Sequence, residues 1–218
     1  MRFRAIIFDL DGVLVESELL WEMADRVFAN RHTVTLTNEL IRSFKGRRQP
    51  DIIEEYRRAT GLTGETADLV QERSEIVKTI LSSNAKMVPG AREFLELLRL
   101  SYADVPLAVA SSSPHDVIDH ELRLFALRDF FRVTVSGEDV PDGKPAPDIY
   151  LHTASLLGVV AEECLVIEDS ASGVDAAKAA GMTCVALEKP YVTAAESNRA
   201  DRVIAGFHEL TPEMLEAL

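Results

Sequence analysis

The chain has 218 residues, of which 47% are hydrophobic and 27% are charged, a composition typical of a globular protein. Its formal net charge of −13 at pH 7 disfavours binding to a nucleic-acid backbone or to an anionic membrane surface. Its apolar runs are far shorter than the ~20 residues that a membrane-spanning helix needs. We expect Cys164 and Cys184 to be buried, reduced thiols of a cytoplasmic protein, because they form no CxxC pair and each adjoins an apolar run.

The first predicted strand covers residues 4–8, a short apolar run that ends at acidic residues, as expected of a buried parallel strand. From about residue 16 to residue 86, apolar residues recur at helical spacing and no strand is predicted. Thr37 and the step from Pro50 to Asp51 are predicted helix starts, and residues 61–64 are a predicted break between helices.

After residue 90, helical and strand patterns alternate. The predicted strands cover residues 106–111, 132–135, 164–168, 183–187 and 201–204. The predicted helices cover residues 91–100, 114–126, 147–157 and 172–180. Such alternation indicates a parallel sheet that is covered by helices on both faces. We therefore predict an α/β fold in which residues 1–15 and 87–218 form a Rossmann-like three-layer core and residues 16–86 form an inserted, all-helical cap.

A pair of carboxylates, Asp9 and Asp11, follows the first predicted strand. Two residues apart on an extended chain, both side chains point to the same side, and open α/β sheets bind their ligands at this end of the strands. A cation or a shared proton relieves the repulsion between such carboxylates. We interpret the pair as a nucleophile and an acid/base beside a divalent metal. An Asx turn that merely ends the strand is the alternative.

A second acidic pair, Glu168 and Asp169, follows the apolar strand at residues 164–168. With Ser170, these residues also fit the start of the next helix, where Asp and Ser are favoured caps. A small set of oxygen ligands is what Mg²⁺ prefers, because it keeps several waters and shares its coordination shell with phosphate. The two acidic pairs together predict a Mg²⁺ site.

Three serines and a proline follow the strand at residues 106–111. Ser111 and Ser112 would form an anion cradle, because hydroxyls and backbone N–H groups gather there just before a helix. Ser113 alternatively caps that helix, with Pro114 in its first turn.

Lys144 lies between Gly143 and Pro145, which restrict its backbone position. A lysine held in this way would neutralise a nucleophilic carboxylate and a bound phosphoryl group together. A solvated loop lysine is the alternative.

The order of these motifs resembles that of the haloacid dehalogenase superfamily of phosphohydrolases and mutases, in the branch with a helical cap inserted after the first motif. The resemblance rests on residues 9–17, 110–113, 143–148 and 167–173, together with the cap segment 44–46. These motifs span essentially the whole chain in the order that the family shows.

The resemblance implies a phosphatase that hydrolyses a small phosphorylated metabolite, a sugar or polyol phosphate, through an aspartyl-phosphate intermediate. Asp9 would be the nucleophile, and Asp11 would protonate the leaving oxygen and then activate water. Ser111 and the N–H of Ser112 would hold phosphoryl oxygens, and Lys144 would offset their charge.

The same resemblance implies Mg²⁺ as the cofactor. The ion would be held by the carboxylates of Asp9 and Asp169 and by the backbone carbonyl of Asp11, with Glu168 in or near its shell. We expect no nucleic-acid or membrane partner, and we expect a monomer.

A basic loop within the predicted cap stands out in this acidic chain. It consists of Lys45, Gly46, Arg47, Arg48 and Gln49. We interpret the loop as a clamp for an anionic or hydroxylated part of the substrate when the cap closes. A solvated helix start is the alternative.

The main alternative is a β-phosphoglucomutase. That family has a histidine where this chain has Trp21 and a phosphate-binding arginine where it has Gln49, although Arg47 or Arg48 would be able to replace that arginine. We therefore favour a phosphatase and expect Trp21 to pack on the substrate or within the cap. A receiver-like signalling domain that is phosphorylated on aspartate is a further alternative, but its aspartate lies on a middle strand of a much shorter chain.

Overall fold

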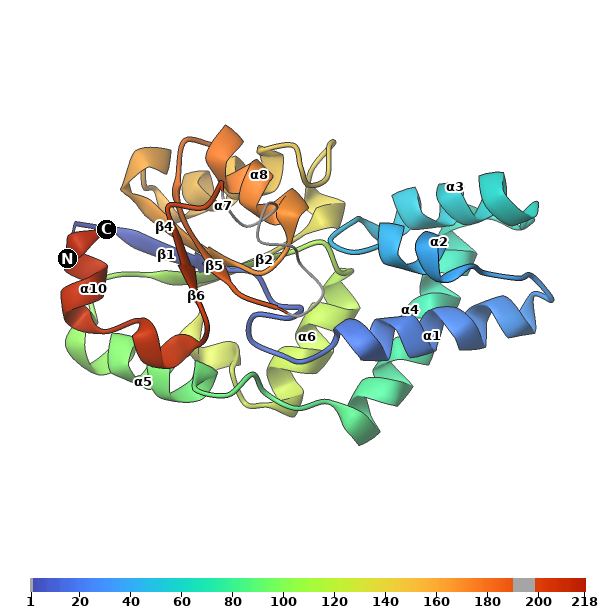
Figure 1. Ribbon diagram of the computed structural model, residues 1–218, viewed down its shortest axis with the longest axis horizontal. Helices are drawn as coiled ribbons and strands as arrows, with labels where there is room; N and C mark the ends of the chain where they lie inside the picture. Colours follow the sequence, from blue (N-terminus) through green and yellow to red (C-terminus); the bar gives the residue numbers. More distant parts are fainter. Residues whose placement is uncertain (1, 190–198) are drawn as a thin grey trace.

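The computed structural model describes residues 2–189 and 199–218. Figure 1 shows an α/β core and, at one end of it, a separate group of helices that the chain forms directly after the first strand. This arrangement confirms the predicted fold class, a parallel α/β core with an inserted helical cap. The exact boundaries of core and cap stay a prediction, and residues 1 and 190–198 of the predicted core lie outside the described residues.

The described residues form one sheet of six parallel strands in the order β3-β2-β1-β4-β5-β6. The strands are β1 (Ala5–Phe8), β2 (Leu107–Ser111), β3 (Val133–Ser136), β4 (Cys164–Glu168), β5 (Thr183–Leu187) and β6 (Arg202–Ile204). Each lies within one residue of its predicted bounds. The first strand is central in the sheet and every one of its residues is buried, which explains its uninterrupted apolar sequence.

Helices cover both faces of the sheet because successive strand residues point to opposite sides. Ile6 and Phe8 face a layer formed by α5 (Ala91–Ser101), α6 (His115–Leu124) and α10 (Pro212–Ala217). Ala5 and Ile7 face the other layer, formed by α7 (Asp148–Leu157) and α8 (Ala171–Ala179). Short 3₁₀ turns connect these elements at Arg128–Phe130, Gly137–Asp139, Ala161–Glu163 and Phe207–Glu209.

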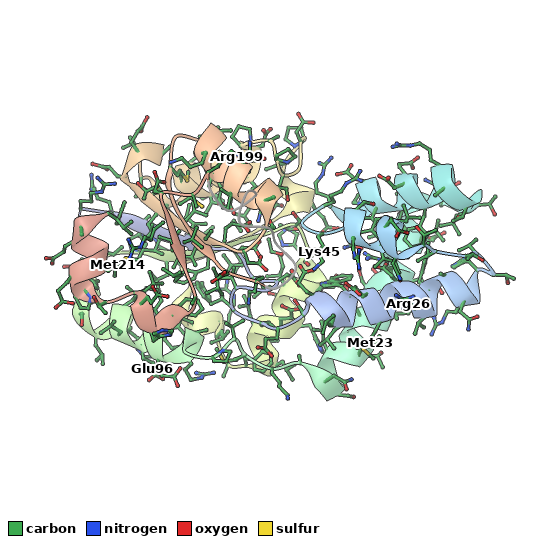
Figure 2. All side chains as sticks on the ribbon, in the orientation of Figure 1. Met23, Arg26, Lys45, Glu96, Arg199 and Met214 are labelled. Carbon is green, nitrogen blue, oxygen red and sulfur yellow. The ribbon has the colours of Figure 1, made fainter. Side chains whose placement is uncertain are left out.

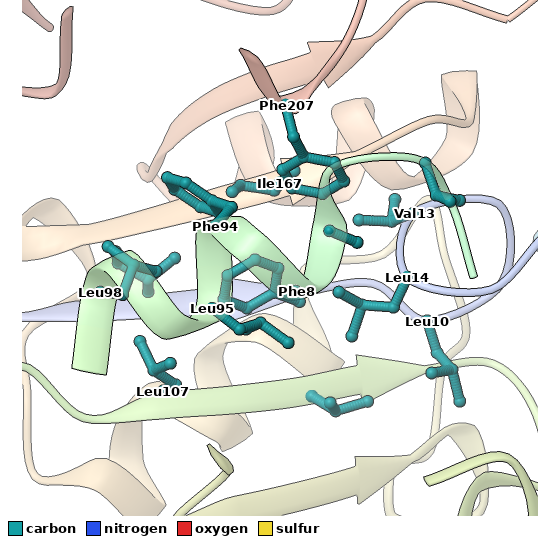
Figure 3. Close-up of a cluster of buried hydrophobic side chains, with 14 of the residues drawn as sticks. Phe8, Leu10, Val13, Leu14, Phe94, Leu95, Leu98, Leu107, Ile167 and Phe207 are labelled. Atoms are coloured by element: carbon teal, nitrogen blue, oxygen red, sulfur yellow. The ribbon is translucent and has the colours of Figure 1, made fainter. Parts of the chain in front are cut away.

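The first of these layers also buries the loop that follows β1. Figure 3 shows Leu10, Val13 and Leu14 in the same apolar cluster as Phe8 and Phe94, and none of them is exposed beyond a few per cent. The ring of Phe8 packs edge-on against Phe94, with 6.2 Å between the ring centroids. This packing fixes the backbone from which the first acidic pair projects.

The cap has its own apolar core. The cap consists of α1 (Glu18–Arg31), α2 (Asn38–Ser43), α3 (Gln49–Thr60) and α4 (Thr66–Asn84). These helices pack around Phe28, Ile53, Tyr56 and Leu81. The predicted helix start at Thr37 is confirmed, since its hydroxyl accepts a hydrogen bond from the N–H of Leu40 at 3.2 Å. The predicted break is confirmed as well: α3 ends at Thr60, and its C-cap Gly61 has a φ of 76°, in the left-handed region.

No helix in the described part of the chain is both long and apolar enough to cross a membrane.

The two cysteines are fully buried, as predicted from the sequence. Burial raises the pKa of the Cys164 thiol to about 11, and burial also raises the pKa of Cys184. A thiol reacts as its thiolate, so we expect neither cysteine to react with Ellman's reagent in the native protein at mildly alkaline pH. Both should react once guanidinium unfolds the chain. Rapid labelling of the native protein would contradict this burial.

Candidate active site

The register of the central strands brings the two acidic pairs together. Phe8 of β1 is the partner of Ile167 in β4, so Asp9 and Glu168 are the next residues along neighbouring strands. The N–H of Asp9 continues the pairing by donating to the carbonyl of Ile167 at 3.0 Å. Both strands thus end at one edge of the sheet with a carboxylate beside a carboxylate.

Lys144 lies between these two carboxylates. Its Nζ donates to Oδ1 of Asp9 at 2.6 Å, to Oε1 of Glu168 at 2.7 Å and to the carbonyl of Ala110 at 3.3 Å. The residue is only 5% exposed, so it is not a solvated loop lysine. Burial alone would lower the pKa of Lys144, but the carboxylates of Asp9 and Glu168 outweigh this effect and raise the pKa. The ammonium therefore stays protonated.

Glu168 is fully buried and both of its oxygens accept hydrogen bonds. Besides Lys144, Oε1 accepts from the hydroxyl of Tyr150 at 2.9 Å. Oε2 accepts from the backbone N–H groups of Asp169 and Ser170, each at 2.8 Å, and from the Ser170 hydroxyl at 3.0 Å. Burial raises the pKa of Glu168, but Lys144 and these donors outweigh burial and lower the pKa.

A glycine on α8 makes room for this carboxylate. A Cβ on Gly173 would lie only 1.6 Å from Oε1 of Glu168. The N–H of Gly173 also donates to the hydroxyl of Ser170 at 3.0 Å, which confirms Ser170 as the cap of the helix. Sequence reasoning assigned no role to Gly173 or Tyr150. The glycine ends the last motif, which was the available signal, whereas nothing in the sequence connects Tyr150 to Glu168.

Asp9 carries charge that its surroundings compensate only in part. Burial raises its pKa well above the usual range, and Glu168 and Asp11 add to the effect, against the opposing effect of Lys144. A cation beside Asp9 would offset the burial of its charge and the repulsion from Glu168 and Asp11. The carboxylates of Asp9, Glu168 and Asp169 offer oxygens that lie within 4.8 Å of one another. This set of hard oxygen donors fits a divalent cation such as Mg²⁺.

Within this set, Asp9 and Asp169 line the pocket between core and cap, whereas Glu168 does not. Because both oxygens of Glu168 already bind Lys144, Tyr150 and backbone donors, Asp9 and Asp169 are the side chains that fit direct contact with a metal.

Asp11 accepts hydrogen bonds from both core and cap. Its Oδ1 accepts from the hydroxyl of Ser17 at 2.6 Å and from Nε1 of Trp21 at 2.8 Å. Its Oδ2 accepts from the hydroxyls of Ser113 at 2.8 Å and Ser111 at 3.1 Å. Three of the four donors are hydroxyls, and the fourth is an indole N–H that is only able to donate.

The hydrogen bonds that Trp21 and Ser113 donate to Asp11 were not predicted. Trp21 does pack within the cap, with its ring 4.8 Å from the guanidinium carbon of Arg73, but it also reaches across to Asp11. The proposed capping role of Ser113 is wrong, because its hydroxyl donates to Asp11 and the N–H of His115 donates instead to Glu138 at 3.0 Å. A short polar side chain at a helix start has several partners available, and sequence alone does not select among them.

The two predicted phosphate-binding serines differ in position. Ser111 is buried, and its hydroxyl donates to Asp11 while accepting from the N–H of Ser113 at 3.0 Å. Ser112 lines the pocket, and its hydroxyl donates to the carbonyl of Gly46 in the cap at 2.7 Å. Phosphate binding by either residue stays a prediction.

The basic loop of the cap divides into two parts. Lys45, Gly46, Arg47 and Gln49 line the pocket, and Figure 2 shows Lys45 in the region between the core and the cap helices. Arg48 does not line the pocket. Lys45 pairs with Glu18 at 3.0 Å, Arg47 with Glu55 and Arg48 with Asp51. The substrate clamp stays a prediction for this loop.

A buried polar cluster forms the cap side of the pocket, and sequence reasoning missed it. Nε of Arg73 donates to Oδ1 of Asp25 at 2.7 Å, and the hydroxyl of Tyr56 donates to the same oxygen at 2.9 Å. Arg73 also donates to Oε1 of Gln49. Asp25 and Arg73 lie on different helices, and charged residues on helices are usually exposed. No local sequence pattern therefore indicates that these two residues form a buried pair.

Comparison with known proteins gives a consistent result. The family model of haloacid dehalogenase-like hydrolases matches residues 6–187. The chain is 36% identical over 178 residues to a phosphorylated carbohydrates phosphatase of Thermotoga maritima, covering 82% of each chain. It is 33% identical over 190 residues to hexitol phosphatase B of Escherichia coli, covering 85% of this chain and 84% of that one.

The solved structures include a β-phosphoglucomutase from Clostridium difficile, with a TM-score of 0.85, 21% identity and coverage of 99% of this chain and 96% of that one. At this identity the likeness concerns the fold alone. The family match and the curated relatives together extend over most of the sequence and include the strands that carry the acidic pairs. The chain therefore belongs to the haloacid dehalogenase-like hydrolase family.

Proposed function

We propose that this protein hydrolyses the phosphate ester of a small sugar or polyol through a phosphoaspartate on Asp9, with Mg²⁺ as its cofactor. As a member of this family with phosphatase relatives, the chain is a phosphoric monoester hydrolase. The observation that carries the proposal is the position of Asp9 in the wall of the pocket, with Lys144, Asp169 and Asp11 around it.

In the first step, a carboxylate oxygen of Asp9 attacks phosphorus. Lys144 binds Oδ1, which orients the carboxylate and leaves Oδ2 as the attacking atom. The bond from phosphorus to the ester oxygen breaks, and Asp11 gives that oxygen its proton. In the second step, Asp11 takes a proton from water as the water oxygen attacks the phosphoaspartate, and phosphate leaves with Asp9 restored.

Asp11 must therefore alternate between two protonation states. A hydroxyl is able to donate to a carboxylate and to accept from a carboxylic acid after rotating. The hydroxyls of Ser17, Ser111 and Ser113 thus hold Asp11 in place in either state. Trp21 binds Asp11 only as a donor, so this bond orients the oxygen Oδ1.

Charge neutralisation would come from two sources. Mg²⁺ would be held by the carboxylates of Asp9 and Asp169, and when bound it supplies positive charge against the phosphoryl oxygens. Lys144 supplies a permanent positive charge, because Asp9 and Glu168 keep it protonated. Phosphoryl transfer depends mainly on such positioning and neutralisation.

The charge balance of the cap pocket supports a hydroxylated, uncharged leaving group. Three cations among the described residues line the pocket, but Lys45, Arg47 and Arg73 each pair with a carboxylate of the cap. A second phosphate would have to displace one of these carboxylates. Hydroxyl groups are able to hydrogen-bond to both members of each pair without displacing either. This balance favours a phosphatase over a mutase that passes through a bisphosphate.

The nucleophile and the metal ligand are tested by three substitutions. We expect Asp9→Asn to lower kcat by at least about three orders of magnitude, because an amide oxygen is a poor nucleophile. Asp169→Asn should weaken Mg²⁺ binding measured by isothermal titration calorimetry, since it removes a carboxylate ligand. Asp11→Asn should slow turnover but keep Mg²⁺ binding. Equal loss of Mg²⁺ binding in Asp11→Asn and Asp169→Asn would show that the roles are misassigned.

Gly173→Ala tests whether Glu168 holds Lys144 in position. The added Cβ has no space beside Glu168, so we expect a loss of about 1–3 kcal/mol in the free energy of unfolding together with a large drop in kcat/KM. Thermal unfolding and turnover of a phosphate ester measure both. Gly158→Ala is the matched control: its Cβ meets nothing within 4 Å, but its φ of 71° costs about 1 kcal/mol. The control should keep its kcat/KM, and an active Gly173→Ala enzyme would contradict the assigned role of Glu168.

The reaction products distinguish a phosphatase from a mutase. We expect the enzyme to release inorganic phosphate from sugar and polyol monophosphates. When β-glucose 1-phosphate is supplied with glucose 1,6-bisphosphate, we expect no conversion to glucose 6-phosphate. Formation of glucose 6-phosphate without release of phosphate would establish the mutase instead.

A further inference from the structure

Arg48 lies immediately before α3 in the cap, but its side chain extends to the core. Its Nη1 donates to the carbonyl of Val140 at 2.9 Å and to the carbonyl of Pro141 at 2.6 Å. Nε and Nη2 of the same guanidinium donate to the two carboxylate oxygens of Asp51 at 2.8 and 3.1 Å. The guanidinium is thus oriented by its own helix and bound by a loop of the core.

The core loop has a notch that fits this side chain. A Cβ on Gly143 would lie 2.7 Å from Cγ and 2.8 Å from Cδ of Arg48, and a Cβ on Gly137 would lie 2.8 Å from Cγ. Neither glycine has a φ in the left-handed region, so the backbone does not require glycine there. The stem of Arg48 occupies the space that a side chain at either position would need.

The same cap loop meets the core at two further points. The carbonyl of Gly46 accepts from the Ser112 hydroxyl at 2.7 Å. A Cβ on Gly46 would lie 2.5 Å from Oγ of Ser172, so this glycine also permits a close approach. These contact points lie close in sequence to the site residues: Gly143 precedes Lys144, Ser112 is itself a site residue, and Ser172 follows Asp169 by three residues.

We propose that Arg48 is a positioning residue, which seats the cap loop in the Gly137–Gly143 notch and thereby closes the pocket over the reacting phosphate. The catalytic effect of this role rests on the proposed function. The contact between the cap loop and the notch does not. Arginine suits the position because a planar fork is able to bind Asp51 in a bidentate manner while donating to two carbonyls. A lysine has no such fork.

The single tryptophan of the chain reports on the seating without any substrate. Trp21 lines the pocket, packs on Arg73 and donates to Asp11 in the core. We expect Arg48→Ala to loosen the cap, which shifts the Trp21 emission to longer wavelength and increases its quenching by acrylamide.

Arg48→Met keeps the stem in the notch but removes the hydrogen bonds to the two carbonyls, so its quenching should lie between that of Arg48→Ala and wild type. Arg58→Ala is the matched control, because it removes an exposed arginine of the same helix and should change neither signal.

A double-mutant cycle tests the notch itself. Gly143→Ala should increase quenching in the wild-type background, since its Cβ collides with Arg48. In the Arg48→Ala background the same substitution should add nothing, because the colliding side chain is gone. An equal effect of Gly143→Ala in both backgrounds, or wild-type quenching in both Arg48 variants, would overturn the proposal.

Kinetics with p-nitrophenyl phosphate separate this role from the proposed function. In Mg²⁺ buffer we expect Arg48→Ala to lower kcat/KM about tenfold, because the charged hydrogen bonds to the carbonyls of Val140 and Pro141 are lost. Circular dichroism should show that every variant is folded. If the wild type does not hydrolyse the probe while the quenching follows the cycle, the proposed function fails and the seating role stands. If hydrolysis is normal and the quenching of the Arg48 variants matches wild type, the seating role fails alone.

Discussion

The buried ammonium of Lys144 is the interaction on which the rest of the site depends. It forms ion pairs with both Asp9 and Glu168, which the register of β1 and β4 places side by side at the end of the sheet. Two buried carboxylates without a cation would be strongly unfavourable, and one of them would take up a proton instead. Because the lysine comes from a third segment, it also ties the loop at residues 143–146 to the two central strands. Asp9, Glu168 and the ammonium of Lys144 are therefore positioned as one unit.

Sequence reasoning located the fold well because the physical signal was local. The strands Cys164–Glu168 and Thr183–Leu187 have the bounds predicted from the sequence, since buried parallel strands are uninterrupted apolar runs that end where charge or glycine begins. The acidic pairs were predicted to meet because strand ends of a parallel sheet share one edge. The partners of each side chain were not predictable in this way. Glu168 lies beside Asp9 and Asp169, as a place in or near a metal shell requires, but its bonds to Lys144 and Tyr150 were not predicted. Nothing in a periodic pattern specifies which polar groups meet in three dimensions.

Several polar contacts join the cap to the core. Trp21 reaches Asp11, Ser112 reaches the carbonyl of Gly46, and Arg48 reaches two carbonyls of the core loop. In the cap cluster, Val117 of α6 is the buried apolar residue contributed by the core. Hydrogen bonds of this kind exchange readily with water, whereas a large apolar interface would not separate without a high cost in free energy. An enzyme whose substrate must enter between the two parts gains from such an interface.

The central position of β1 has a consequence for the order in which the chain acquires its structure. Its neighbours in the sheet, Leu107–Ser111 and Cys164–Glu168, are synthesised long after it, and the cap lies between them in the sequence. Contacts within the cap join residues that are close in sequence, so they become available first during translation, while the strand that precedes Asp9 waits for distant partners. Asp9 is therefore among the last residues of the acidic cluster to gain its neighbours, because Lys144, Glu168 and Asp169 are all synthesised long after it.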